Sequence, residues 1–185
     1  MFLANHRFTV EIKKDNQYTL FSTDNQHYDY TIRTEEFDRN DYVCVYCIIV
    51  NSNIENYKIA IITRCYGQID NCVILEEERL VLLADNYIVF LNLTSKKLES
   101  IKQVIDVGTG IGMYSFDSGY TVNGEIDVIK VDKLGNKLWS FSGRDIWVTL
   151  SGEEAIQIND NKLMLTDFNG DTYEIDKYGK ELKNK

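Results

Sequence analysis

The sequence predicts an all-β protein built from repeated units of short antiparallel strands. Three observations indicate this class: a stretch of the chain repeats itself, residues that favour strands (Tyr, Phe, Val and Ile) are abundant, and proline is absent from all 185 positions. The 11 glycines are spread unevenly, since only Gly67 precedes residue 108, so most of the turn punctuation falls in the last third. Hydrophobic residues make up 44% of the chain, which is enough for a buried core.

An internal repeat has copies spaced 40 and then 44 residues apart. Each copy reads as a strand, a tight turn, a second strand, a polar turn and a third strand. The copies cover residues 79–98, 126–139 and 162–182, with Asn92, Asp132 and Asp176 at one equivalent position and Leu98, Leu138 and Leu182 at another. A period in the forties with several short strands per unit predicts a blade-like repeat.

Turn residues indicate where the strands of each copy connect. Asn123-Gly124 and Asn169-Gly170 predict type I′ hairpins, because both central positions of that turn need a positive φ. A second turn follows in each copy. There Asp132 and Asp176 are expected to cap the local backbone with their carboxylates.

A blade-closing phrase stands at residues 131–141, which read VDKLGNKLWSF. It resembles the repeats of quinoprotein-like (PQQ-type) β-propellers, in which an aspartate, a turn, glycine, lysine, leucine and tryptophan close a blade. Residues 175–182 keep the pattern, and the resemblance covers roughly residues 73–182. It implies propeller-like repeats, about three to four blade-like units, whereas a cofactor-binding quinoprotein has about six to eight blades. The resemblance therefore implies this fold without a cofactor.

Residues 1–70 fit the period poorly and are expected to form an irregular N-terminal sheet. The predicted elements are a hairpin of 9–13 and 18–21 and two buried strands at 42–50 and 57–63. This sheet is either a degenerate first blade or a cover for the open edge of the others. Residues 73–84 allow a helical interpretation, but the match of their second half to 162–165 favours strand. We expect one domain over residues 1–185.

The acidic charge balance limits the class of partner. The net charge is −9 and the pI is about 4.7, which disfavours nucleic acids and anionic membranes, because binding to either needs clustered Lys and Arg. The sequence has no apolar run of about 18 residues, so no membrane span is predicted. The first residues lack the apolar region of a secretory signal, so we expect a cytoplasmic location without disulfides.

Three patterns suggest a metal or phosphate site, and each has a simpler structural interpretation. Cys44 and Cys47 lie three apart on a predicted strand and so face opposite sides, and the spacing of Cys65 and Cys72 is unusual for zinc, which favours core thiols and no metal. Residues 167–174 have the composition of a calcium loop, but their glycine is not at the EF-hand position. The glycine-rich segment 107–113 precedes no predicted helix, which favours a flexible connection.

A cluster of charged residues is the first candidate partner-binding set. Glu125 and Asp127 lie two apart on one predicted strand and therefore share a face. Arg144 and Asp145 open the next predicted strand, at 146–148. Paired carboxylates can perform general acid–base chemistry or bind a cation, and they can equally pair with Arg144 at the surface.

A polar aromatic segment is the second candidate set, with Tyr28 and Tyr30 as its contact residues. The same tyrosines can equally be plain edge-strand surface. Neither His6 nor His27 lies in a motif that would supply a nucleophile with its base, so no catalytic residue is assigned.

The function that these features predict is a non-enzymatic protein–protein interaction module with a basic protein partner, whose encounter an acidic surface would accelerate. The small, acidic, all-β character resembles that of bacterial immunity proteins, without a shared motif. The alternative is a small hydrolase or a sugar- or metal-binding module that uses the carboxylate cluster. A third interpretation is a partial propeller completed by a second copy, as a homodimer through exposed edge strands.

Overall fold

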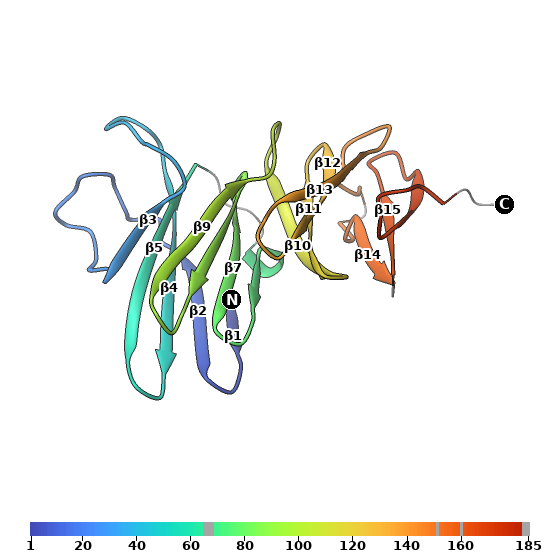
Figure 1. Cartoon of the computed structure of the whole chain (residues 1–185). Helices are drawn as coiled ribbons and strands as arrows, with labels where there is room; N and C mark the ends of the chain where they lie inside the picture. Colours follow the sequence, from blue (N-terminus) through green and yellow to red (C-terminus); the bar gives the residue numbers. More distant parts are fainter. Residues whose placement is uncertain (65–68, 151, 160, 183–185) are drawn as a thin grey trace. The chain divides into compact units, whose positions relative to one another are not determined.

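The structure is a computed structural model that describes residues 1–64, 69–150, 152–159 and 161–182. Within these residues, sixteen strands form four sheets, and the helical content is a single 3-10 turn, η1 (Ile69–Asn71). The all-β prediction is therefore confirmed (Figure 1). No helix in the described part of the chain is long and apolar enough to cross a membrane.

The first sheet has five strands in the order β1-β2-β4-β5-β3. Its members are β1 (Phe2–Ala4), β2 (Phe8–Lys14), β3 (Tyr30–Arg33), β4 (Cys44–Ser52) and β5 (Asn56–Thr63). Strand β3 runs parallel to β5, and the other pairs are antiparallel. The predicted strand at 18–21 is absent, and this segment belongs to a loop because Tyr18 and Leu20 pack onto the face of β4 and β5. The predicted strands at 9–13, 42–50 and 57–63 are present.

The second sheet is a meander of four strands in chain order. Its members are β6 (Val73–Leu75), β7 (Arg79–Ala84), β8 (Tyr87–Asn92) and β9 (Lys97–Gln103). The strand interpretation of residues 73–84 is therefore correct. Several hydrogen bonds connect this sheet to the first one, among them those from Asn5 Nδ2 to the Glu76 carbonyl (2.8 Å) and from the Tyr57 hydroxyl to the Leu93 carbonyl (2.6 Å).

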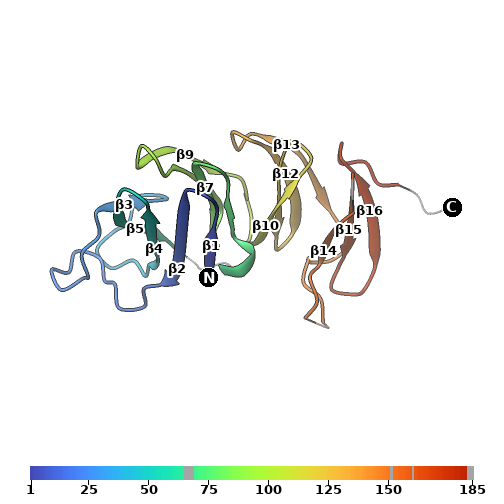
Figure 2. The same cartoon turned by 90° about the horizontal axis from the view of Figure 1, so that it is seen from below.

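The third and fourth sheets repeat the meander (Figure 2). The third contains β10 (Gly110–Phe116), β11 (Gly119–Gly124), β12 (Asp127–Asp132) and β13 (Lys137–Ser142), and the fourth contains β14 (Ile156–Asn159), β15 (Lys162–Thr166) and β16 (Thr172–Asp176). Glu181 forms an antiparallel bridge with Ile175, and the Leu182 amide donates to the Glu174 carbonyl at 2.7 Å. Leu182 therefore lies beside β16 in the way that the outer strands β9 and β13, which contain Leu98 and Leu138, lie beside the third strands of their sheets. The propeller-like repeat is confirmed.

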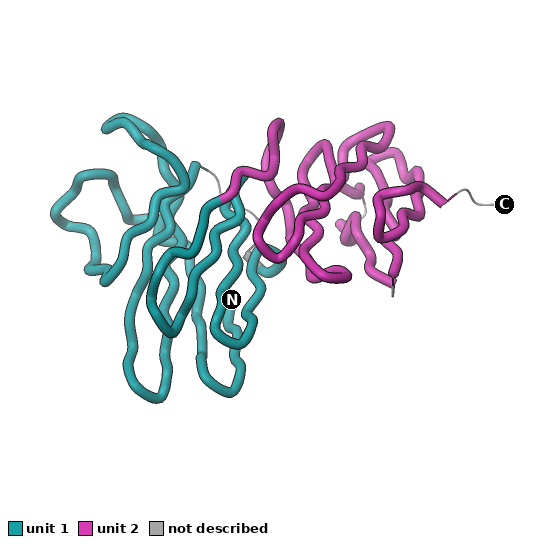
Figure 3. Tube along the Cα trace, in the orientation of Figure 1, with its two compact units in different colours: residues 1–101 teal, residues 102–185 magenta. Residues whose placement is uncertain are grey.

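The chain divides into two compact units, residues 1–101 and 102–185 (Figure 3). Unit 1 holds the first sheet and nearly all of the second, and unit 2 holds the third and fourth sheets. A single domain over residues 1–185 stays a prediction.

Three turns in unit 2 share one design, in which an aspartate binds the turn that follows it. Asp132 Oδ1 accepts the amides of Leu134 (2.8 Å) and Asn136 (2.9 Å), and Gly135 closes the turn with φ +81°. Asp176 makes the same two contacts with the amides two and four residues later, both at 2.9 Å. The predicted capping by Asp132 and Asp176 is therefore confirmed. Asp167 repeats the arrangement at 3.1 and 2.9 Å.

The Asn-Gly pairs behave differently from the type I′ prediction. Asn123 and Gly124 end strand β11, and the turn to β12 lies at the next two residues, 125 and 126. The turn was misplaced because the backbone of Gly124 continues the ladder with β10. Asn169-Gly170 does lie in the β15–β16 turn, but only Gly170 of the two has a positive φ (+84°), because the Asp167 cap sets the turn.

Unit 2 packs around Trp147, which is fully buried in the segment between β13 and β14. Its ring centroid lies 6.0 Å from that of Phe141 and 5.5 Å from that of Tyr173. The predicted strand at 146–148 does not form, because the Trp147 amide donates to the Glu125 carbonyl (3.0 Å) while the Ile146 carbonyl accepts the Phe168 amide (2.9 Å). These bonds reach two separate elements and build no ladder.

A second tryptophan joins the third and fourth sheets. Trp139 on β13 donates its indole N–H to the Lys177 carbonyl at 2.9 Å. Its ring covers Gly179 so closely that a Cβ at that position would lie 2.7 Å from the Trp139 Cγ atom. The glycine of the Asp176 turn is therefore required both for its φ of +82° and for this contact.

Candidate partner-binding surface

Two loops of unit 1 carry a strong excess of negative charge. They are residues 15–29, between β2 and β3, and residues 34–43, between β3 and β4, and we call them together the acidic loop surface. Their 25 residues contain seven Asp and Glu, one Arg and no Lys, together with five aromatic side chains. Their formal charge is −6.

Both loops are held by apolar side chains that cover one face of β4 and β5. Phe37 from the second loop is buried with Val45, Ala60 and Ile62. Tyr18, Leu20 and Tyr28 from the first loop pack against this cluster. The loops therefore have a small core of their own, which orders them without regular secondary structure.

The first loop is tied to the sheet at its beginning by Asp15. The Asp15 amide donates to the Val45 carbonyl (2.8 Å), and its carboxylate accepts the Tyr28 hydroxyl (2.6 Å) and Gln26 Nε2 (2.8 Å). Burial raises the pKa of Asp15, but the hydrogen bonds from Gln26 and Tyr28 outweigh it, so the pKa lies below its usual value. Burial and the bond to Asp15 raise the pKa of Tyr28. Its hydroxyl is thus engaged within the loop.

The other end of the first loop is tied to β5. The Asp29 amide donates to the Lys58 carbonyl (3.0 Å), and the Lys58 amide donates back to Asp29 Oδ2 (2.7 Å). Tyr30 follows as the first residue of β3, is 38% exposed, and packs edge-on against Tyr57 with the ring centroids 6.1 Å apart. The tyrosines predicted from the sequence thus lie at the closed base of the loop.

A pocket of about 400 Å³ lies where the two loops meet. Asp15 and Tyr18 line it from the first loop, and Arg39, Asp41 and Tyr42 line it from the second. The Tyr42 side chain is 80% exposed at its rim. Mixed charge and an accessible aromatic ring are typical of protein contact sites.

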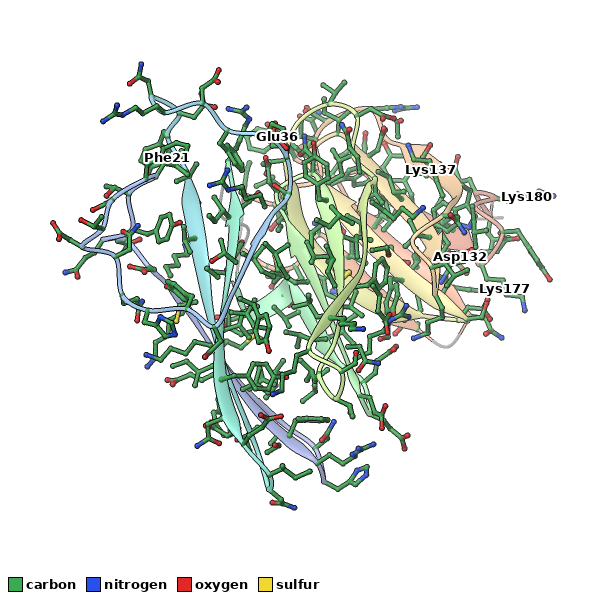
Figure 4. All side chains as sticks on the ribbon, turned by 60° about the vertical axis from the view of Figure 1, so that its left-hand side comes forward. Phe21, Glu36, Asp132, Lys137, Lys177 and Lys180 are labelled. Carbon is green, nitrogen blue, oxygen red and sulfur yellow. The ribbon has the colours of Figure 1, made fainter. Side chains whose placement is uncertain are left out.

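Arg64 neutralises part of the negative charge at one border of the surface. Its Nε atom lies 2.9 Å from Glu35 Oε1, and a terminal nitrogen lies 3.8 Å from Asp41 Oδ2. Glu36, labelled in Figure 4, and Asp24 are exposed. The surface keeps a strong negative charge.

The carboxylates predicted in unit 2 do not form one cluster. Glu125 lies in the turn before β12 and not on a strand, and its Oε2 atom approaches Gly108, where an added Cβ would be 3.1 Å away. Asp127 begins β12 and accepts a hydrogen bond from the Ser142 hydroxyl. The expectation that Glu125 and Asp127 share a strand face is wrong, because the turn comes two residues later than the Asn-Gly pair predicted.

Arg144 and Asp145 pair with the β15–β16 turn. The Arg144 guanidinium lies 3.7 Å from Asp171 Oδ2, and Asp145 accepts the Asn169 side-chain amide at 2.7 Å. Neither contact involves Glu125 or Asp127. Both residues instead fix the segment that carries Trp147 to the fourth sheet.

The described cysteines are core residues. Cys44, Cys47 and Cys72 are buried, and burial raises the pKa of Cys72 to about 12. Cys65 lies outside the described residues. Across the described ranges, no group of three or more His, Cys, Asp or Glu side chains could hold a metal ion.

The sequence analysis missed three exposed residues of the acidic loop surface. Phe21, Glu36 and Tyr42 lie on its outside. A count of charge would have selected residues 15–43, with seven of the 29 acidic residues, together with residues 152–176, which also contain seven. The exposure of Phe21 had no such signal.

No protein-family model and no curated protein sequence matches this chain. Among solved structures it is similar to BamB from Moraxella catarrhalis (TM-score 0.49, 11% identity, covering 86% of this chain and 52% of that one) and to the dihydro-heme d1 dehydrogenase NirN (TM-score 0.49, 12% identity, 80% and 36%). A third is Hsv2p from Kluyveromyces lactis (TM-score 0.42, 10% identity, 83% and 49%). This chain spans about half or less of each of these chains. The propeller-like fold follows from the chain's own strand order and repeated turns.

Proposed function

We propose that this chain is a non-enzymatic protein-interaction scaffold that binds a basic protein through the acidic loop surface. The observation that carries this proposal is the combination of a formal charge of −6 with exposed aromatic side chains on two ordered loops. Complementary charge accelerates encounter, and aromatic side chains on an ordered surface supply affinity at low entropic cost.

The finer proposal is an immunity-type inhibitor that acts in the cytoplasm by covering its basic partner. The acidic charge and the small all-β design support it. The repeats are proposed to be of the quinoprotein type without a cofactor, supported by the phrase at residues 131–141 and by the contact of Trp139 with the Asp176 turn.

The experiment is an affinity capture from native lysate with charge-reversed variants. Glu36→Lys/Asp38→Lys changes two exposed carboxylates of the acidic loop surface, and Glu125→Lys/Asp127→Lys is the matched control in unit 2. We expect one basic protein at near-stoichiometric yield, lost with the first variant and kept with the second. Loss only with the second variant would transfer the site to unit 2. No basic protein at any salt concentration would refute the proposal.

Self-association is a separate proposal. Strands β3, β9 and β13 each lie at the end of a sheet order, where an edge strand can pair with another chain. Light scattering after size exclusion tests this: we expect a homodimer, and a monomer at all concentrations would contradict it.

A further inference from the structure

Phe21 holds an unusual backbone conformation at the outer end of the first loop. Its φ is +61°, and the three other non-glycine residues with positive φ in the described part of the chain lie in the β7–β8, β8–β9 and β10–β11 connections. In those tight connections a left-handed residue is expected. Phe21 also lies in a turn, in which the Ser22 amide donates to the Thr19 carbonyl at 3.3 Å, but a bulky aromatic residue is strained in this conformation.

The same conformation points the aromatic ring away from the loop core. Leu20 packs into the apolar cluster, whereas the next side chain, Phe21, is 59% exposed. The Arg33 guanidinium lies 5.6 Å from the centroid of the Phe21 ring, at a distance typical of a cation–π contact. Phe21 is labelled in Figure 4. Glycine or asparagine would suit the backbone better at this position, and a polar side chain would suit the exposure better.

The segment around Phe21 is ordered by its own hydrogen bonds. Asn25 Oδ1 accepts the Thr19 amide (3.0 Å), and Asn25 Nδ2 donates to the carbonyls of Thr19 (2.7 Å) and Ser22 (3.2 Å). Asn25 therefore closes the loop end across Phe21. An aromatic side chain on a preformed loop loses little conformational entropy when it is buried by a partner.

We propose that Phe21 is the apolar anchor of the acidic loop surface and inserts into an apolar pocket of the basic partner. This inference rests on the proposed function. Strain retained at an exposed aromatic residue is typical of a binding role, because neither stability nor solubility favours it. The exposed Asp24 in the same loop favours a partner pocket bordered by Lys or Arg, as in interfaces where polar residues surround a central aromatic side chain.

The first test is Phe21→Gly, with Ile54→Ala as the matched control. Ile54 is 92% exposed in the β4–β5 turn, so both variants remove an exposed apolar side chain of unit 1. For Phe21→Gly we expect an unchanged or higher denaturation midpoint, because the strain is relieved. We also expect at least about 30-fold weaker binding of the captured basic protein. Ile54→Ala should leave binding unchanged.

The second test is a photo-crosslink from Phe21→p-benzoylphenylalanine. A crosslink to an apolar residue of the partner flanked by Lys or Arg supports the anchor. Binding that survives Phe21→Gly, with no crosslink but with loss in Glu36→Lys/Asp38→Lys, overturns the anchor and leaves the proposed function intact. If the wild-type chain captures no basic protein, both proposals fail.

Discussion

Aspartates hold the backbone in both units, but over different distances along the chain. In unit 2, Asp132, Asp167 and Asp176 each bind amides two and four residues later, so the whole arrangement lies within five residues. In unit 1, Asp15 accepts Tyr28, 13 residues away, and Asp29 accepts the amide of Lys58, 29 residues away. The local design recurs as a visible repeat, while the long-range design builds a unique surface.

The largest expected effect is on a local turn, with Gly179→Ala. The substitution forces a Cβ to within 2.7 Å of Trp139 and strains a φ of +82°, so we expect a loss of about 3 kcal/mol in the free energy of unfolding. Gly170→Ala is the matched control, because its φ is +84° but nothing lies within 4 Å of the added Cβ. It should cost about 1 kcal/mol in the same denaturant titration. Equal losses would show that Trp139 does not restrict the turn.

The next effect concerns Lys130, which is 1% exposed on β12 and donates to the Phe116 carbonyl. Burial lowers the pKa of Lys130 to about 8, Asp117 raises it slightly and Lys133 lowers it further. At Lys130 the folded state therefore binds fewer protons than the unfolded state between about pH 8 and the usual 10.5, so the contribution of Lys130 to stability rises with pH in that window. The buried Cys72 thiol acts in the opposite direction above its ordinary value of 9.0.

Lys130→Met removes this titration. We expect a gain of about 1 to 2 kcal/mol at pH 7, since a buried charge is lost at the expense of one hydrogen bond. The difference in stability between the variant and the wild type should shrink as the pH rises from 8 to 10.5, as measured by denaturation at several pH values. The exposed Lys102→Met is the control, and its difference from the wild type should stay constant over this range.

A smaller effect is expected at the Asp132 cap. Partial burial raises the pKa of Asp132, but hydrogen bonds from Asn136 and Leu134 outweigh it and the pKa is lowered. Its contribution is therefore complete above the ordinary value of 3.8 and is lost as the pH falls through the lower folded value. Asp132→Asn should cost about 1 kcal/mol at pH 7 and flatten the acid side of the profile. Asp106→Asn, an exposed partner of Lys137, should do neither.

The smallest effect on global stability is expected from Tyr28→Phe in unit 1. The variant keeps the ring but loses the 2.6 Å bond to Asp15, at about 0.5 to 1 kcal/mol. Amide hydrogen exchange should accelerate within residues 15–29 and stay unchanged in β12. Uniform acceleration in both places would mean that the loop has no independent stability.

The sequence could predict the local contacts of the chain but not the contacts between distant residues. The coincidence of Asp132 with Asp176 predicted two turns and their caps, because every atom involved lies within five residues. The sequence predicted only a hairpin at the Asp167 turn, because Asp167 is not at the position of the repeat that Asp132 and Asp176 share. The Asn123-Gly124 turn was misplaced by two residues, because pairing of Gly124 with β10 outweighs the local preference. Propensity alone cannot report such a pairing.

The candidate surface was predicted only in part. Tyr28 and Tyr30 were identified, but the partner of Tyr28 is Asp15, and no sequence pattern joins these residues across the loop. Phe21 could not be predicted, because its left-handed backbone results from the packing of Leu20 and the bonds of Asn25. Surfaces built from long-range contacts require the fold.

Both tryptophans of the chain, Trp139 and Trp147, lie in unit 2, which gives the molecule a built-in optical reporter. Tryptophan fluorescence follows the unfolding of the third and fourth sheets alone, whereas far-ultraviolet circular dichroism follows the unfolding of all four sheets. Coincident curves would show that heat disassembles the chain in one cooperative step. Separated curves would resolve two melting events, and the spectroscopic gap between them would measure how independently unit 1 persists.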